Sequence, residues 1–185
     1  LPASQTRDKD ALTDEGVAEV INELAKQFDY IVCDSPAGIE RGAQLAMYHA
    51  DEAIIVTNPE ISSVRDSDRI IGILQSRTKK VEEGTGVVRE HLVINRYNAE
   101  RAERGEMMDI NSLSNDILKV PLLGVIPESN SVLEASNQGV PVVLDQNSKA
   151  GQTYDDMVAR FLGEERPYRH IEVKKKSFLQ RWFGG

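Results

Sequence analysis

Four short apolar runs, separated by segments of helical character, constrain the fold of this 185-residue chain more than any other feature. They lie at residues 30–33 and in "EAIIVTNP", "HLVIN" and "VPLLGVIP". Between them, residues 13–27 and 63–77 repeat apolar side chains at the spacing of a helix. Alternation of this kind predicts an α/β fold with a mostly parallel sheet and helices on both faces. Weaker patterns predict further helices at 43–49, 106–118, 131–138 and 152–162, and a small edge strand in "PVVLD".

An acidic residue, Asp34, follows the first apolar run in "FDYIVCDSPAG". The carboxyl edge of a parallel sheet is where ligands bind in α/β proteins. A carboxylate there can hold Mg²⁺, directly or through water, for a nucleoside triphosphate. The alternative is an acid that caps the following turn.

The glycine-rich loop that would hold the phosphates, G-x-x-x-x-G-K-[ST], occurs nowhere in the chain. Gly84 and Gly86 form the nearest glycine pair, but no Lys-Ser/Thr follows them, so we expect a turn. The missing loop and a first residue other than Met lead us to expect a P-loop-like fold that is incomplete at its N-terminus. The first residues also lack the basic region and apolar core of a signal peptide.

Two other strand ends fall at the same predicted edge, in "INRYN" and "VIPESNSV". The amide of Asn95 could pair with the edge of an adenine ring. Pro127 and the residues after it could form a rigid wall beside that ring. Each segment alone is equally consistent with an ordinary strand-to-helix turn. Their convergence on one edge is what favours a nucleotide site.

Charge is divided unevenly along the chain. The net charge is −8, yet residues 166–185 contain six Lys/Arg and one Glu, a net of +5, which leaves −13 on the other 165 residues. An acidic body makes general nucleic-acid binding unfavourable. The single cysteine, Cys33, excludes an internal disulfide and indicates a reducing cytosol. We expect Cys33 to be a core thiol.

The basic end, "IEVKKKSFLQRWFGG", predicts an amphipathic helix of the kind that lies on a membrane surface. Its apolar face would carry Ile171, Phe178, Leu179, Trp182 and Phe183, and its basic residues are Lys174, Lys175, Lys176 and Arg181. Each basic residue attracts anionic lipid by about 1 kcal/mol. A helix of about a dozen residues is marginal in water, so one copy should bind weakly and two linked copies much better. A tail that packs on its own domain is the alternative.

The chain resembles the MinD/ParA family of deviant-Walker P-loop ATPases over nearly its whole length. The stretches that carry the resemblance are "LPASQTRDKDAL", "FDYIVCDSPAGIE", "ADEAIIVTNPEISSVRDSDRIIGIL", "GVIPESNSVLEASNQGVPVVLD" and "LGEERPYRHIEVKKKSFLQRWFGG". The family carries its phosphate loop near the N-terminus, so the resemblance covers roughly the C-terminal two-thirds. It implies a partial ATPase domain at residues 1–165, followed by a linker and membrane-targeting helix at 166–185.

The resemblance also implies roles for individual residues. Asp34 would be the Walker B acid near Mg²⁺, acting through water, and Gly38 would belong to the second switch. Asp66 would lie on the helix that forms the dimer and partner surface. The adenine surroundings would comprise Asn95, Arg96, Pro127, Glu128 and Val132.

The implied activity is an ATP-driven switch in the selection of the cell-division site. ATP joins two subunits, two tails bind anionic lipid on the inner face of the cell membrane, and the dimer recruits the division inhibitor MinC. MinE stimulates hydrolysis and release to the cytoplasm. The 185 residues alone are expected not to hydrolyse ATP, because the phosphate loop is absent from them.

Three other classes of protein are alternatives to this function. A nucleotide-free α/β interaction module that carries a membrane-binding tail is the main alternative. A chromosome-partitioning relative would need a DNA-binding surface, which the acidic body disfavours. A nitrogenase-type iron protein needs cluster cysteines, and one cysteine excludes it.

Overall fold

A computed structural model describes residues 13–36 and 38–171 of the chain. The chain divides into two compact units. The first unit comprises Leu1–Ala53 and Asp68–Arg89, and the second unit comprises Ile54–Ser67 and Glu90–Gly185. Each unit is described by itself below.

The first unit is built mainly from short helices. Helix α1 (Asp14–Ala25) begins at Thr13, whose side-chain oxygen accepts a hydrogen bond from the backbone N–H of Gly16, as an N-cap does. Helix α2 (Arg41–Tyr48) buries Ala43, Leu45 and Met47. The short helix α4 (Lys79–Glu82) contacts the end of α2, because the Tyr48 hydroxyl donates to Glu82 Oε2 at 2.7 Å. Helices α1 and α2 therefore confirm the predicted helices at 13–27 and 43–49.

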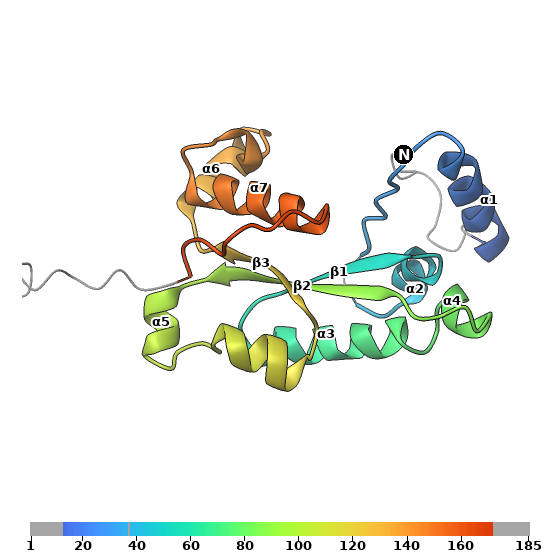
Figure 1. Cartoon of the computed structure of the whole chain (residues 1–185), viewed down its shortest axis with the longest axis horizontal. Helices are drawn as coiled ribbons and strands as arrows, with labels where there is room; N and C mark the ends of the chain where they lie inside the picture. Colours follow the sequence, from blue (N-terminus) through green and yellow to red (C-terminus); the bar gives the residue numbers. More distant parts are fainter. Residues whose placement is uncertain (1–12, 37, 172–185) are drawn as a thin grey trace, which may run out of the picture. The chain divides into compact units, whose positions relative to one another are not determined.

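The sheet contains three strands in the order β1-β2-β3. They are β1 (Glu52–Thr57), β2 (Arg89–Tyr97) and β3 (Leu122–Pro127), and β2 and β3 run parallel. The predicted α/β class with a parallel sheet is confirmed, and three of the four expected strands are present. Figure 1 shows α6 and α7 on one side of the β2–β3 pair and the yellow helical segment Ser112–Ile117 on the other.

Helix α7 (Lys149–Phe161) makes the core of the second unit with β2 and β3. Buried Val93, Leu123, Ile126 and Ala150 form this core. Helix α6 (Asn130–Asn137) and a 3₁₀ turn, η3 (Val142–Leu144), connect β3 to α7. The approach of α7 to the sheet is close at Gly124, where a Cβ atom would lie 3.0 Å from Cγ of Met157. A glycine in β3 therefore makes room for the helix.

The remaining helices are short or run through both units. Helix α3 (Ile61–Leu74) starts two residues before the predicted segment 63–77 and ends three residues before its end. Helix α5 (Ala99–Glu103) was not predicted. The predicted helix at 106–118 is reduced to a π-helical segment, η2 (Ser112–Ile117).

The strand predicted at residues 30–33 is wrong. Residues 30–36 have no regular secondary structure, and Tyr30 and Val32 are 66% and 92% exposed. An extended segment becomes a buried strand only where a neighbouring strand bonds to its backbone. In the described residues the segment pairs with no strand, because the sheet consists of β1, β2 and β3. Cys33 is likewise exposed, so its expected place in the core is also wrong.

The edge strand predicted in "PVVLD" is also absent, because Val142–Leu144 form the 3₁₀ turn η3. Tertiary packing against α7 overrides the β-propensity of the two valines. Helix α7 also begins earlier than predicted, at Lys149. The predicted tail helix lies outside the described residues. None of the helices within the described ranges is long and apolar enough to span a membrane.

Candidate nucleotide site

The carboxyl ends of β2 and β3 lie side by side in the second unit. Tyr97 of β2 pairs with Pro127 of β3, and the backbone N–H of Glu128 donates to the carbonyl oxygen of Tyr97 at 2.9 Å. Two of the three strand ends selected from the sequence therefore meet at one edge of the sheet, whereas the third, before Asp34, is not a strand. The roles of Asn95, Pro127 and Glu128 beside an adenine ring stay predictions.

An irregularity in β2 shapes this edge. The register between β2 and β3 shifts between Ile94 and Tyr97, and Arg96 adopts a left-handed conformation with φ of 54°. A left-handed residue of this size is uncommon and occurs mostly in turns and bulges. Asn95 is half-buried and Arg96 is exposed. The bulge therefore re-aims two polar side chains just before the strand ends, a feature that is frequent next to functional sites.

Asn98, which the sequence analysis did not select, links the two strand-end loops. Its Oδ1 accepts a hydrogen bond from the backbone N–H of Arg101 at 3.1 Å and so caps α5. Its Nδ2 donates to Oε2 of Glu128 at 3.2 Å. An Asn directly before Ala-Glu-Arg was an available signal, because Asn is among the preferred N-cap residues. No pattern in the sequence indicates the hydrogen bond from Asn98 to Glu128.

Replacing Asn98 with alanine is expected to lower the free energy of unfolding by about 1–2 kcal/mol, because the helix cap and the bond to Glu128 are both lost. Urea denaturation followed by circular dichroism measures the change. Asn98→Ser is the matched control, since serine keeps a capping oxygen but is too short to donate to Glu128. Asn98→Ser should recover about half of the loss, and a variant as unstable as Asn98→Ala would contradict the capping role.

Val132 stands in a different environment from the other predicted adenine neighbours. It lies in the first turn of α6, two residues after the helix begins at Asn130, and packs against the core cluster that contains Val93 and Ile126. The Ser129 hydroxyl caps the same turn by accepting from the N–H of Ser131 at 3.3 Å. Val132 thus anchors the first turn of α6 to the core through these contacts.

Asp34 and Gly38 belong to the first unit. Asp34 is exposed on the irregular segment, and Gly38 has a φ of 96°, a conformation that favours glycine. The residues described here contain no cluster of three or more His, Cys, Asp or Glu that could hold a metal ion. A single exposed carboxylate fits Mg²⁺ only as one of its ligands, with waters and nucleotide phosphates as the others. Asp34 is compatible with that arrangement.

The remaining predicted residues were assigned to a dimer and partner surface and to the membrane tail. Asp66 is exposed on α3, in the part of that helix that belongs to the second unit. All the predicted membrane residues lie outside the described ranges: Lys174, Lys175, Lys176, Phe178, Leu179, Arg181, Trp182 and Phe183.

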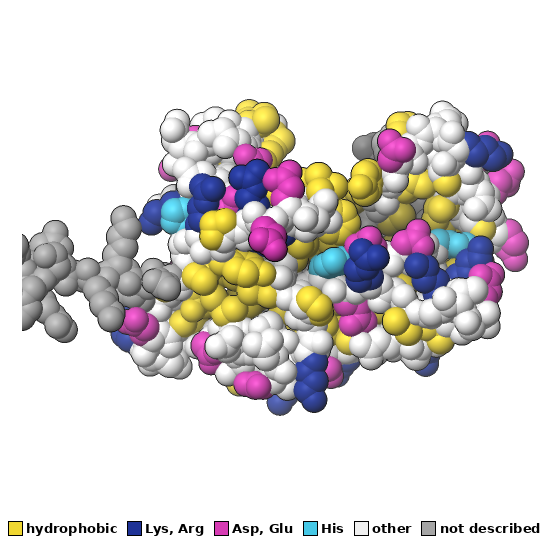
Figure 2. Space-filling model, viewed as in Figure 1, with side chains coloured by type: hydrophobic (Ala, Val, Ile, Leu, Met, Phe, Trp, Pro, Cys, Tyr) yellow, Lys and Arg dark blue, Asp and Glu magenta, His cyan; other side chains and the backbone are white. Residues whose placement is uncertain are grey.

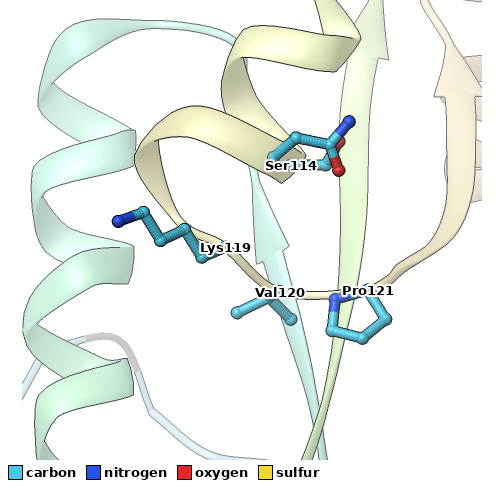
Figure 3. Close-up of a pocket in the computed structure, with 5 residues that line it drawn as sticks. Ser114, Lys119, Val120 and Pro121 are labelled. Carbon is cyan, nitrogen blue, oxygen red and sulfur yellow. The ribbon is translucent and has the colours of Figure 1, made fainter.

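A pocket of about 380 Å³ lies at the other end of β3, before the strand begins at Leu122. Ser114, Asn115, Lys119, Val120 and Pro121 line it, and Figure 3 shows the last three following one another into the strand. It sits at the amino end of β3, whereas ligands in α/β proteins bind at the carboxyl ends. Its position therefore separates it from the candidate site.

Comparison with known proteins gives the class of the protein. A family model described as ParA, NUBPL iron-transfer P-loop NTPase, matches residues 13–162. The parallel pairing of β2 and β3 fits this class of P-loop NTPases.

Relatives and solved structures then narrow the class. The septum site-determining protein MinD of Escherichia coli K12 is 61% identical over the whole chain, and that of Neisseria meningitidis serogroup B is 60% identical. The chain covers 68% and 69% of these two relatives. It therefore belongs to the MinD family of septum site-determining proteins, the cell-division site-selection ATPases of the ParA group.

Three solved structures share the fold. The MinD cell division protein of Aquifex aeolicus has a TM-score of 0.76 at 37% identity, with 86% of this chain and 65% of that chain covered. The MinC:MinD complex from the same organism has a TM-score of 0.70 at 38% identity, with 85% of this chain and 60% of that chain covered. Pyrococcus horikoshii MinD complexed with Mg-ADP has a TM-score of 0.64 at 33% identity, with 82% of this chain and 58% of that chain covered. The chain thus spans less than two-thirds of these structures.

Proposed function

We propose that this chain supplies the adenine-binding edge, the magnesium acid and the membrane tail of an ATP-driven switch that selects the division site. The observation that carries the proposal is the 61% identity to a septum site-determining protein over the whole length of the chain. The described residues add the strand-end edge where β2 and β3 meet.

In the nucleotide part of the proposal, the loops after β2 and β3 hold the adenine ring. The bulge at Asn95 and Arg96 directs their polar groups, Pro127 gives a rigid surface, and the Glu128–Asn98 bond keeps the loops together. Asp34 holds Mg²⁺ through water, and Gly38 gives the adjoining switch segment its freedom to turn. The solved relative with bound Mg-ADP supports ATP and Mg²⁺ as the ligands.

In the membrane part, the tail binds anionic lipid at the inner face of the cell membrane. Three lysines and an arginine attract lipid headgroups, and Phe178, Trp182 and Phe183 insert among the acyl chains. One tail binds weakly because the cost of ordering its helix offsets much of this gain. Two tails on an ATP-bound homodimer bind together, since the second attaches at a high effective concentration.

Two protein partners complete the proposed cycle. The dimer recruits MinC, a partner supported by the solved MinC:MinD complex that shares this fold. MinE stimulates hydrolysis, after which the subunits separate and both tails leave the membrane for the cytoplasm. The exposed face of α3 around Asp66 forms the dimer and partner surface.

Sedimentation with vesicles of phosphatidylglycerol and phosphatidylcholine tests the proposal. The arms are this chain, the chain extended by its upstream reading frame, and the extended Trp182→Glu/Phe183→Glu variant, each with and without ATP. We expect ATP to increase binding of the extended chain at least about tenfold, because it joins two tails. The variant should stay in the supernatant, and a variant that sediments like its parent would contradict the membrane role.

A nucleotide-free interaction module remains the second candidate, because the 185 residues contain no phosphate loop. The two functions make different predictions for the upstream reading frame. A G-K-G-G-x-G-K-[ST] sequence upstream supports the ATP-driven switch, and its absence supports the module.

A further inference from the structure

The segment after α7 turns back along that helix. Gly163 has a φ of 91°, its N–H donates to the carbonyl oxygen of Arg160, and the N–H of Glu164 donates to that of Ala159. This pair of bonds is a Schellman motif, which ends a helix and reverses the chain. We call residues 164–171 the latch, and Figure 1 shows their red trace returning beside α7.

Arg160 of α7 fastens the first part of the latch. Its Nε donates to the carbonyl oxygen of Leu123 in β3 at 2.7 Å. Its Nη1 lies 3.2 Å from the carbonyl oxygens of both Arg166 and Pro167. A planar guanidinium can hold acceptors on two sides at once, so Arg160 ties the latch to the sheet.

Tyr168 continues the attachment. The Arg160 guanidinium carbon lies 4.3 Å from the centre of the Tyr168 ring, within the range of a cation–π contact. The Tyr168 hydroxyl donates to the carbonyl oxygen of Leu122 at 2.6 Å. Neighbouring carbonyl groups of β3 thus accept bonds from both Arg160 and Tyr168.

The last part of the latch reaches the middle of α7. Nε of Arg169 lies 2.8 Å from Oδ2 of Asp156, whose side chain is 5% exposed. That oxygen makes no hydrogen bond of good direction, so the contact with Arg169 is an ion pair. His170 Nε2 lies 3.4 Å from Oε1 of Gln152. Successive latch residues therefore meet successive turns of α7 in the direction of its N-terminus.

The charge pattern fits attachment of the latch to the helix. Figure 2 shows Lys and Arg side chains interspersed with Asp and Glu on the face that carries α7. Latch and helix together line a polar pocket of about 380 Å³, to which Asp156 and Arg169 contribute. The latch follows the helix for about nine helical residues, or roughly 13 Å.

We propose that the latch fixes the point from which the basic tail leaves the second unit, and that Arg160 and Tyr168 are the positioning residues. The inference rests on the proposed membrane function of the tail. The first lysine of the tail, Lys174, lies three residues after the end of the latch. A closed latch removes eight residues from each tether between the body and the membrane helix.

Tether length matters only when two tails bind together. The effective concentration of the second tail falls roughly as the −3/2 power of tether length once the tether can span the sites. Releasing eight residues on each subunit should therefore weaken the two-tail binding of the ATP-bound dimer severalfold. Binding by a single tail should not change.

The test uses the upstream-extended protein and vesicles of phosphatidylglycerol and phosphatidylcholine. Arg160→Met/Tyr168→Phe removes the four hydrogen bonds that these two side chains donate but keeps their apolar parts. The matched control inserts eight Gly/Ser residues after Ile171 in the parent, which lengthens the tether and leaves the latch intact. Circular dichroism and ATP-dependent dimerisation confirm that both proteins fold. Trypsin cleavage after Arg169 reports the opening of the latch, and we expect about a fivefold faster rate in the double variant.

The double variant and the insertion should both weaken ATP-dependent vesicle binding by the same factor, with ATP-free binding unchanged. Weakening by the insertion alone would show that the latch does not shorten the tether, and the inference fails. No weakening in either protein would show that tether length is irrelevant, and the inference fails again. If the parent itself shows no ATP-dependent binding, the proposed function fails first.

Discussion

Replacing Gly151 with alanine is expected to lower the free energy of unfolding by about 3 kcal/mol, the upper end of the usual loss from overpacking. An ideal Cβ atom at this position would lie 2.3 Å from the carbonyl oxygen of Asp145 and 2.7 Å from that of Val142. It would also lie 2.8 Å from the Oγ of Ser148. Two of these three neighbours, and the two closest, are backbone atoms, so a side-chain rotation alone cannot relieve the clash.

The clash would also disturb the start of α7. The Ser148 hydroxyl caps the helix by accepting from the N–H of Gly151 at 2.8 Å, and the 3₁₀ turn at Val142–Leu144 packs against the same place. Alanine favours a helix over glycine by about 1 kcal/mol, which offsets only part of the steric cost. Urea denaturation followed by circular dichroism measures the loss, which corresponds to a fall in Tm of roughly 6–12 °C.

Gly72 in α3 is the matched control for Gly151. It is also a helical glycine, but a Cβ atom there would meet nothing within 4 Å. Gly72→Ala is expected to leave stability unchanged or to raise it by up to about 1 kcal/mol, because helix propensity improves without a clash. Equal destabilisation by the two substitutions would show that close packing at Gly151 is not the cause.

The same glycine explains part of what sequence patterns could not predict. Strands β1, β2 and β3 and helices α1, α2 and α6 followed from local periodicity, because their apolar faces match the period of the element they form. The segment "PVVLD" has the composition of a strand, yet it forms a 3₁₀ turn. The space left by the missing Cβ of Gly151, rather than the apolar pattern of the segment, decides how that turn packs against α7.

The strand prediction for residues 30–33 failed for a different reason. Their composition is that of a buried strand, but pairing depends on a partner segment elsewhere in the chain, which periodicity does not reveal. For the candidate site, parallel order alone placed Asn95 near Pro127 and Glu128. The Asn98–Glu128 bond depends on loop conformation and side-chain direction, so only the structure could provide it.

The second large effect concerns Asp34. In the protein extended by its upstream reading frame, Asp34→Asn is expected to lower kcat for Mg²⁺-dependent ATP hydrolysis by at least about 100-fold. Asparagine keeps the size and a carbonyl oxygen but removes the negative charge. Mg²⁺ prefers anionic oxygen ligands and neutralises charge that develops on the phosphates, so the neutral variant should place the ion poorly.

Asp29→Asn tests whether the loss reflects the position of the carboxylate or merely the charge of the segment. Asp29 lies five residues before Asp34 and is likewise exposed, so its substitution removes the same charge from the same stretch of chain. Hydrolysis by Asp29→Asn should stay within about twofold of the parent, since long-range effects of exposed charges are screened by salt. Steady-state phosphate release at several Mg²⁺ concentrations distinguishes the two variants, and only Asp34→Asn should also need more Mg²⁺. An Asp34→Asn protein with parental activity would therefore remove the magnesium role on which the ATP-driven switch depends.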